Sequence, residues 1–441
     1  MEEFPIPYFP NTEADRQEML KVIGVSSADD LFQDIPAPYR DVSLDLPPAL
    51  SELELRLEME ELARNNYTPG EYACFLGGGA SRHYVPAVVR QIISRGEFMT
   101  SYTPYQPEVS QGTLQATYEF QTMICQLTGM DIANAGMYEG ASAFAEAALM
   151  ACRVTGRENI LVLDTVTPSY RQVLETYAIP QGLKVQITTS SRVYVEEGTA
   201  CLMVQNPNHL GYLEDLGGLA EKAHQQETLL VVSVDPTSLA FFRPPGDFSA
   251  DIVVGETQPL GIPLSFGGPY VGLFACREEY LRQMPGRIVG KTVDTQGRTG
   301  YVLTLQAREQ HIRRARATSN ICTSEALIAL ASTSYVSALG KRGLRHVAEL
   351  CYHKAHYAAS LIEGIPGYSL PISGTFFKEF VVQCPLPPAE VNDRLTNYRI
   401  IGGLDVSDMA PNGMLFCVTE MNGVGEIEAL AEALAEIGAS A

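Results

Sequence analysis

The chain has 441 residues, 46% of them apolar, and a formal net charge of −21. Its length suits two domains, one of them large enough to bury a sizeable core. The negative charge argues against nucleic-acid binding, which depends on Lys and Arg side chains that neutralise phosphates. No segment approaches the roughly 18 uncharged apolar residues that a membrane span needs.

Cysteine usage and the amino terminus bear on the compartment. The nine cysteines are scattered and form no CxxC pair, which is typical of free thiols in a reducing cytoplasm. Residues 1–8 carry no basic leader followed by an apolar stretch, so neither a secretory signal nor a transit peptide is expected. We therefore expect a cytoplasmic protein.

Residues 1–60 combine turn-forming prolines with one short amphipathic stretch at 13–23. This pattern predicts an amino-terminal arm that lies on another surface. A helix is predicted to start at Ser51, because Ser51 and Glu54 have the spacing of a capping box.

Residues 61–325 alternate helical periods with short apolar runs. The runs lie at residues 160–164, 185–188, 201–205, 229–235, 252–254 and 271–275. Strands separated by helices imply βαβ crossovers, so we predict a large α/β domain with a mainly parallel sheet.

Residues 326–441 follow a different pattern. A long helical stretch runs to about residue 362, and two strand-like segments and two further helices follow it. The last helix places Ile427, Leu430, Leu434 and Ile437 on one face. These elements predict a smaller α+β carboxy-terminal domain.

The most informative local feature is a lysine that is missing after a strand ending in Asp235. After Asp235 come a second strand and a Gly/Pro-rich turn at 259–269. Pyridoxal-phosphate enzymes of the aspartate aminotransferase type have the same order of elements, which carry their pyridinium aspartate and Schiff-base lysine. Gln258 stands where that lysine is expected, and no lysine occurs from His224 to Gly290. A carboxamide cannot form an imine with an aldehyde. The chain is therefore a non-catalytic partner or a different enzyme.

A small-residue loop at 138–142 leads into a helix, an arrangement that offers N–H groups to an anion. In a pyridoxal enzyme of this fold, such a loop holds the cofactor phosphate. Glu139 would repel a phosphate there, although an acidic residue near a helix start is also favourable by itself.

Three further segments are candidates for a site. Residues 102–112 hold Tyr102, Tyr105 and Gln106 in a proline-rich loop that either lines a site or only packs. The glycines at 77–79 precede His83, and the basic cluster at 308–325 ends in hydroxyls and an amide suited to phosphate or carboxylate recognition. No metal is expected, because Cys351, His353 and His356 lack a second ligand pair.

Several of these stretches together resemble the P-protein of the glycine cleavage system, glycine decarboxylase, as the first subunit of its two-chain form. They lie at residues 77–86, 102–108, 110–115, 127–131, 205–208, 261–269, 308–314 and 318–323. The chain departs from the family pattern at Glu139, where a shorter aspartate is expected, and at Pro259, where a small residue is more usual.

The resemblance implies pyridoxal-phosphate transferase fold type I and an α2β2 heterotetramer. The lysine and the pyridoxal phosphate would belong to the second subunit, so no cofactor would be bound by this chain. The complex would decarboxylate glycine and pass the aminomethyl unit to the lipoyl arm of the H-protein, with the T- and L-proteins as indirect partners.

With the resemblance in view, we hypothesise that this chain completes the active site from across the interface. Tyr102, Tyr105 and Gln106 would border the substrate, and His83 is a further catalytic candidate. Asn320 and Thr323 would approach the phosphate of the partner's cofactor.

Two alternatives stay open. The chain could be a self-sufficient pyridoxal enzyme that uses a displaced lysine, such as Lys291 or Lys184. It could also be a structural or regulatory paralogue without a residue in any active site.

Overall fold

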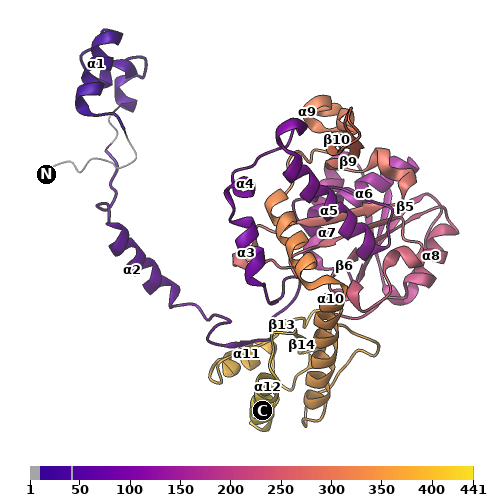
Figure 1. Cartoon of the computed structure of the whole chain (residues 1–441). Coiled ribbons are helices and arrows are strands. Elements are labelled where there is room, and N and C mark those ends of the chain that lie inside the picture. Colours follow the sequence, from indigo (N-terminus) through magenta and orange to yellow (C-terminus); the bar gives the residue numbers. More distant parts are fainter. Residues whose placement is uncertain (1–9, 41–42, 441) are drawn as a thin grey trace. The chain divides into compact units, whose positions relative to one another are not determined.

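Figure 1 shows the computed structural model of the chain, which describes residues 10–40 and 43–440. The chain divides into two compact units, residues 1–66 and residues 67–441. Residues 1–8, in which no leader sequence was expected, lie outside the described residues. None of the described helices is long and apolar enough to cross a membrane.

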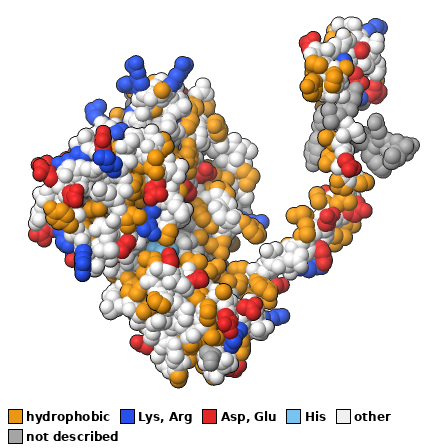
Figure 2. Space-filling model, turned by 180° about the vertical axis from the view of Figure 1, so that it is seen from behind, with side chains coloured by type: hydrophobic (Ala, Val, Ile, Leu, Met, Phe, Trp, Pro, Cys, Tyr) orange, Lys and Arg blue, Asp and Glu red, His pale blue; other side chains and the backbone are white. Residues whose placement is uncertain are grey.

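The amino-terminal unit contains α1 (Glu13–Ile23) and α2 (Glu52–Ala63). The predicted capping box is confirmed, since Ser51 accepts from the backbone N–H of Glu54 and the Glu54 carboxylate accepts from Ser51 in return. Figure 2 shows apolar side chains along the segment that carries α2. They are Leu53, Leu55, Leu57, Met59 and Leu62, each more than half exposed. That the arm lies on another surface stays a prediction.

A seven-stranded sheet is the centre of the second unit. Its strands are β2 (Ile132–Ala133), β3 (Asn159–Leu163), β4 (Lys184–Thr188), β5 (Thr199–Asn206), β6 (Leu229–Val234), β7 (Ile252–Glu256) and β8 (Gly272–Cys276). The order is β2-β8-β7-β6-β5-β3-β4. All neighbours are parallel except β8, which runs antiparallel to both β7 and β2. The predicted mainly parallel α/β sheet is confirmed.

The inner strands of the sheet form where apolar residues run without interruption, as in parallel sheets covered by helices on both faces, whereas the edge strand β4 is polar and largely exposed. All six residues of β6 are buried, as are the first six of β5. The helices of this region are α3 (Ala87–Ile93), α4 (Gly96–Met99), α5 (Gln111–Thr128), α6 (Gly140–Thr155), α7 (Pro168–Ala178), α8 (Leu216–His224) and α9 (Gln310–Arg313). Together the strands and helices enclose the first hydrophobic core.

A β-hairpin that the sequence did not reveal follows the sheet. β9 (Ile288–Val293) pairs antiparallel with β10 (Thr299–Thr304), and its inner residues Val289 and Leu303 pack with Leu114 of α5. The side-chain amide of Gln121 in α5 also donates to the backbone oxygen of Val289 and accepts from its backbone N–H. The hairpin is thereby fixed to α5.

The long helix α10 (Ala326–Glu363) joins two cores, as Figure 1 shows. Its first half contributes Tyr335 to the first core, and its second half contributes Ala355 and Ile362 to a second core. That second core also takes in Phe75, which follows β1 (Ala73–Cys74). Its other elements are β11 (Glu379–Gln383), α11 (Pro388–Thr396), β12 (Ile400–Ile401), β13 (Leu404–Asp405), β14 (Gly413–Cys417) and α12 (Val424–Ala439). A domain boundary at 325/326 stays a prediction.

Candidate functional site

A pocket lies at the carboxyl ends of β5, β6 and β7, where parallel α/β sheets usually bind ligands. We call it the Asp235 pocket. It is lined by Gly78, Gly79, Ser81, Thr167, Tyr170, Gln205, Pro207, Asn208, His209, Gly211, Ser233, Val234, Asp235, Glu256, Pro259, Phe377, Lys378 and Glu379. Its free volume is about 60 Å³.

Lys378 fills the end of this pocket that holds Asp235. Its ammonium nitrogen lies 2.7 Å from an Asp235 carboxylate oxygen, 2.8 Å from the Ser81 hydroxyl and 3.1 Å from Nε2 of His83. Burial raises the pKa of Asp235, but the charge and hydrogen bond of Lys378, together with His83 and the N–H of Thr237, hold that pKa below its ordinary value. Burial lowers the pKa of Lys378, but Asp235 and the other groups around it, Glu379 among them, together raise that pKa above its ordinary value. The two groups form an ion pair inside the pocket.

Gln258 is fully buried beside the same pocket. Its amide nitrogen donates to the backbone oxygens of Ser81 and Ile262 at 3.0 and 2.9 Å, and its amide oxygen accepts from the Ser81 N–H at 3.1 Å. These bonds tie the end of β7 to the segment after the glycines at 77–79. Gln258 therefore has a structural role where a Schiff-base lysine was expected.

Carboxylates occupy the amino terminus of α6, where the cofactor phosphate would lie. Glu139 accepts from the N–H of Ser142 at 2.9 Å, and Glu256 accepts from the N–H of Gly140 at 2.9 Å. Burial raises the pKa of Glu256 to about 7. Both helix N–H groups are thereby satisfied by the chain's own side chains, which would also repel a phosphate. The Asp235 pocket does not fit pyridoxal phosphate at either end.

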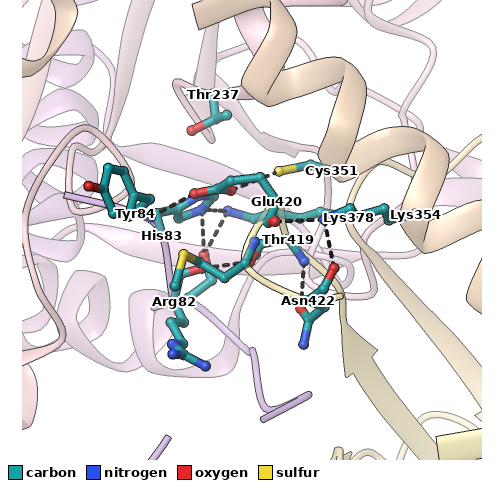
Figure 3. Close-up of polar contacts among 12 residues, drawn as sticks. Arg82, His83, Tyr84, Thr237, Cys351, Lys354, Lys378, Thr419, Glu420 and Asn422 are labelled. Carbon is teal, nitrogen blue, oxygen red and sulfur yellow. Dashed lines mark hydrogen bonds and ion pairs between the residues drawn. The ribbon is translucent and has the colours of Figure 1, made fainter. Parts of the chain in front are cut away.

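Behind Lys378, His83 joins the two cores of the unit. Figure 3 shows its ring between Glu420 and Lys378. Nδ1 of His83 lies 2.8 Å from a Glu420 oxygen, and the network assigns the ring proton to Nδ1, because Nε2 faces the ammonium of Lys378. Burial raises the pKa of Glu420, but its contacts with His83 and its hydrogen bond from the N–H of Tyr84 lower that pKa to about 2. His83 itself does not line the pocket.

His83, Glu420 and Cys351 are also the one group among the described residues whose ligand atoms are close enough to share a metal, all within 4.8 Å. The Cys351 thiol donates to Glu420 at 3.4 Å, and burial raises its pKa well above the ordinary value. His356, considered with Cys351 from the sequence, instead bonds to the carbonyl of Phe376. The three side chains bond to one another and need no ion.

A second pocket brings together two of the segments singled out from the sequence. We call it the Tyr102 pocket, and its free volume is about 200 Å³. Tyr102, Thr103 and Pro104 line it on one side, and Thr323 and Ser324, just before α10, on another. Tyr102 is 77% exposed, so most of its ring is free for a partner.

Tyr105 is held beside this pocket by residues that sequence reasoning missed or read differently. Its hydroxyl accepts from Nη2 of Arg287 at 3.2 Å, and its ring packs against that of His311 at 5.3 Å between centroids. Gln106 and Asn320, by contrast, are exposed, and within residues 10–40 and 43–440 neither side chain forms a hydrogen bond. The roles of Tyr102, Tyr105, Gln106, Asn320 and Thr323 stay predictions.

The structure also bears on the lysines proposed as substitutes. Lys184 starts the edge strand β4 and Lys291 lies in the hairpin; both are exposed, and neither lines the Asp235 pocket. The lysine that does line it is Lys378, which the sequence reasoning missed because nothing near it in the chain marks it. Its three N–H groups all have acceptors, and a protonated amine is not a nucleophile.

Comparisons with known proteins show the family of the chain. A family model described as glycine cleavage system P-protein matches residues 7–434. The chain is 52% identical over 444 residues to a probable glycine dehydrogenase (decarboxylating) subunit 1 of Thermomicrobium roseum, covering 97% of this chain and 99% of that protein. A protein of the same description from Desulforamulus reducens is 51% identical over 448 residues, covering 98% and 99%.

Solved structures give the same relationship. A crystal structure of glycine decarboxylase (P-protein) of the glycine cleavage system, in inhibitor-bound form, is 45% identical with a TM-score of 0.93, covering 98% of this chain and 99% of that chain. A C-DES mutant with glycine covalently linked to its pyridoxal-phosphate cofactor shares the fold alone, at 14% identity and a TM-score of 0.59, covering 85% and 99%. The predicted fold type I is confirmed. With a family model matched over nearly its whole length and relatives about half identical, this chain belongs to the glycine cleavage system P-protein family.

Proposed function

We propose that this chain is subunit 1 of a two-chain glycine dehydrogenase (aminomethyl-transferring, decarboxylating) that works in the cytoplasm. It pairs with a second subunit that carries pyridoxal phosphate, as an α2β2 heterotetramer. The observation that carries the proposal is the Lys378–Asp235 ion pair, together with Gln258 at the lysine position. The relatives named subunit 1 support the same division of labour.

In this proposal the chain's own residues shape the site of the partner. The partner's cofactor, when bound, supplies the electron sink that glycine decarboxylation needs. Tyr102, Tyr105 and Gln106 orient the substrate from across the interface. The Asn320 amide and the Thr323 hydroxyl donate hydrogen bonds toward the cofactor phosphate, near the amino terminus of α10.

His83 has a different place in the proposal from the one that sequence reasoning gave it. Its side chain is fully buried between Glu420 and Lys378, so we propose that it positions Lys378 and does not touch substrate. The aminomethyl group passes to the lipoyl arm of the H-protein, and the T- and L-proteins act on later steps.

A reconstitution experiment tests the function. The purified chain, its presumed second subunit and the H-protein are mixed, and exchange of bicarbonate into the glycine carboxyl group is measured. We expect exchange only when both subunits are present, with an unrelated protein in place of this chain as the control. Full activity from the second subunit without this chain would overturn the proposal.

A further inference from the structure

Tyr105 is clamped between two side chains of the segment that follows the sheet. The guanidinium carbon of Arg287 lies 5.5 Å from the centroid of the Tyr105 ring, within the range of a cation–π contact. Arg287 also donates to the phenol oxygen, and the His311 ring covers another part of the Tyr105 ring. Tyr105 nevertheless stays 45% exposed, so the clamp fixes the ring without burying it.

Arg287 is an unusual residue to find in this place, because its side chain is only 7% exposed. Its one carboxylate neighbour is Glu309, at 3.5 Å from Nε. That distance is too long for a strong hydrogen bond, and among the described residues neither Nε of Arg287 nor Oε1 of Glu309 has a hydrogen-bond partner. A buried ion pair with this geometry adds little to stability, since desolvation offsets the attraction. Stability alone does not explain Arg287.

The residues around Arg287 are arranged to hold it still. Arg308 donates to the backbone oxygens of Met284 and Gly286, the latter at 2.7 Å, so it fixes the turn just before Arg287. Glu309 lies between Arg287 and His311, with an oxygen 3.4 Å from Nδ1 of His311. The run 308–311, which starts the basic cluster 308–325 singled out from the sequence, thereby supports the two side chains that contact Tyr105.

We propose that Arg287 is a positioning residue for the glycine reaction and acts through Tyr105. The inference rests on the proposed function and adds to it. Because the phenol oxygen accepts from Arg287, the hydroxyl proton of Tyr105 is directed away from Arg287 and toward the exposed face. Tyr105 then presents a fixed hydrogen-bond donor to the substrate in the partner's site, with its orientation set before binding.

A double-mutant cycle tests this in the assembled complex. The rate of glycine–bicarbonate exchange at saturating glycine and H-protein is measured for Arg287→Lys, Tyr105→Phe and the double variant. Lysine keeps the charge and loses the planar fork, so we expect Arg287→Lys to lower the rate about tenfold by itself, and less than about twofold in the Tyr105→Phe background. If Arg287→Lys lowers the exchange rate by the same factor with and without the Tyr105 hydroxyl, the proposal is overturned, because the effects of the two substitutions are then independent.

Two further variants separate the possible failures. Arg298→Lys, at an exposed position of the same hairpin, is the matched control and should leave the rate unchanged. If Arg287→Lys reduces assembly, the cycle is repeated with His311→Gln, whose side chain is 26% exposed, and the same coupling to Tyr105 is expected. A full rate for Tyr105→Phe would remove the proposed role of Tyr105 as well as that of Arg287, whereas a reduced rate with additive losses removes only the role of Arg287.

Discussion

The ammonium nitrogen of Lys378 lies 2.7 Å from a carboxylate oxygen of Asp235. By the family resemblance, Asp235 is the residue that would pair with the ring nitrogen of a pyridoxal cofactor. Lys378 immediately precedes β11 of the second core, and Asp235 follows β6 of the first. The ion pair therefore joins the two cores at the point where a bound cofactor would lie.

Removing one member of this pair should destabilise the chain strongly. Lys378→Met leaves Asp235, whose side chain is 19% exposed, without its cation, which costs about 3 kcal/mol. The double variant Lys378→Met/Asp235→Asn removes both charges and should recover most of that loss. Denaturant unfolding of the isolated chain measures both effects, with Arg298→Met as an exposed control that changes little. A double variant no more stable than Lys378→Met would show that the charge pair is not the cause.

Restoring the missing amine should not restore cofactor binding. In Gln258→Lys, the ring-nitrogen end of the Asp235 pocket is still filled by Lys378, and the α6 terminus is still capped by Glu139 and Glu256. After incubation with pyridoxal phosphate and borohydride reduction, peptide mapping should find no stoichiometric adduct at the introduced lysine. The second subunit, treated in the same way, is the positive control. A stoichiometric adduct at the lysine introduced in this chain would contradict the prediction, because it would show that the Asp235 pocket still accepts the cofactor.

The Glu420–His83 contact predicts a defined pH dependence. Glu420 has a pKa of about 2 in the folded chain against an ordinary value of 4.5. Because the folded-state pKa is depressed, the carboxylate stabilises the fold by about 3 kcal/mol above pH 4.5, and this is lost as the pH falls toward 2. Glu420→Gln should therefore destabilise the chain most at neutral pH. Unfolding curves at pH 7 and pH 3.5 check this, and an equal loss at both values would contradict it.

Tyr105→Phe should impair turnover without preventing assembly. The substitution keeps the ring packed against His311 and removes only the hydroxyl that accepts from Arg287. We expect the exchange rate of the assembled complex to fall about tenfold or more, with an unchanged size in solution. Tyr194→Phe, at an exposed position, is the control. An undiminished rate would exclude the hydroxyl from the site.

The sequence predicted the elements whose residues are close together in the chain. Apolar runs marked β3 and β5 to β8 to within a few residues, the mixed run 185–188 marked the exposed edge strand β4, and the capping box marked the start of α2. The β9–β10 hairpin was missed because its outer residues, such as Lys291 and Thr299, are exposed and polar, so no apolar run marks it.

The candidate site was predictable only in part, for a related reason. Asp235 and Gln258 stand out because a strand end and a turn mark their positions. Lys378 and Arg287 act on residues far from them in the chain, so no local pattern marks either one. The basic cluster 308–325 predicts phosphate or carboxylate recognition because its charges and hydroxyls are visible in the sequence, whereas the contacts of Glu309 with Arg287 and of His311 with Tyr105 arise only from the fold.

The most direct test of the account is to locate the cofactor in the active complex. This chain, the second subunit and the H-protein are assembled, glycine–bicarbonate exchange is confirmed, and the complex is reduced with borohydride before the subunits are separated. We expect the reduced pyridoxyl group on the second subunit alone, while exchange still requires this chain. A stoichiometric pyridoxyl group on this chain would contradict this expectation.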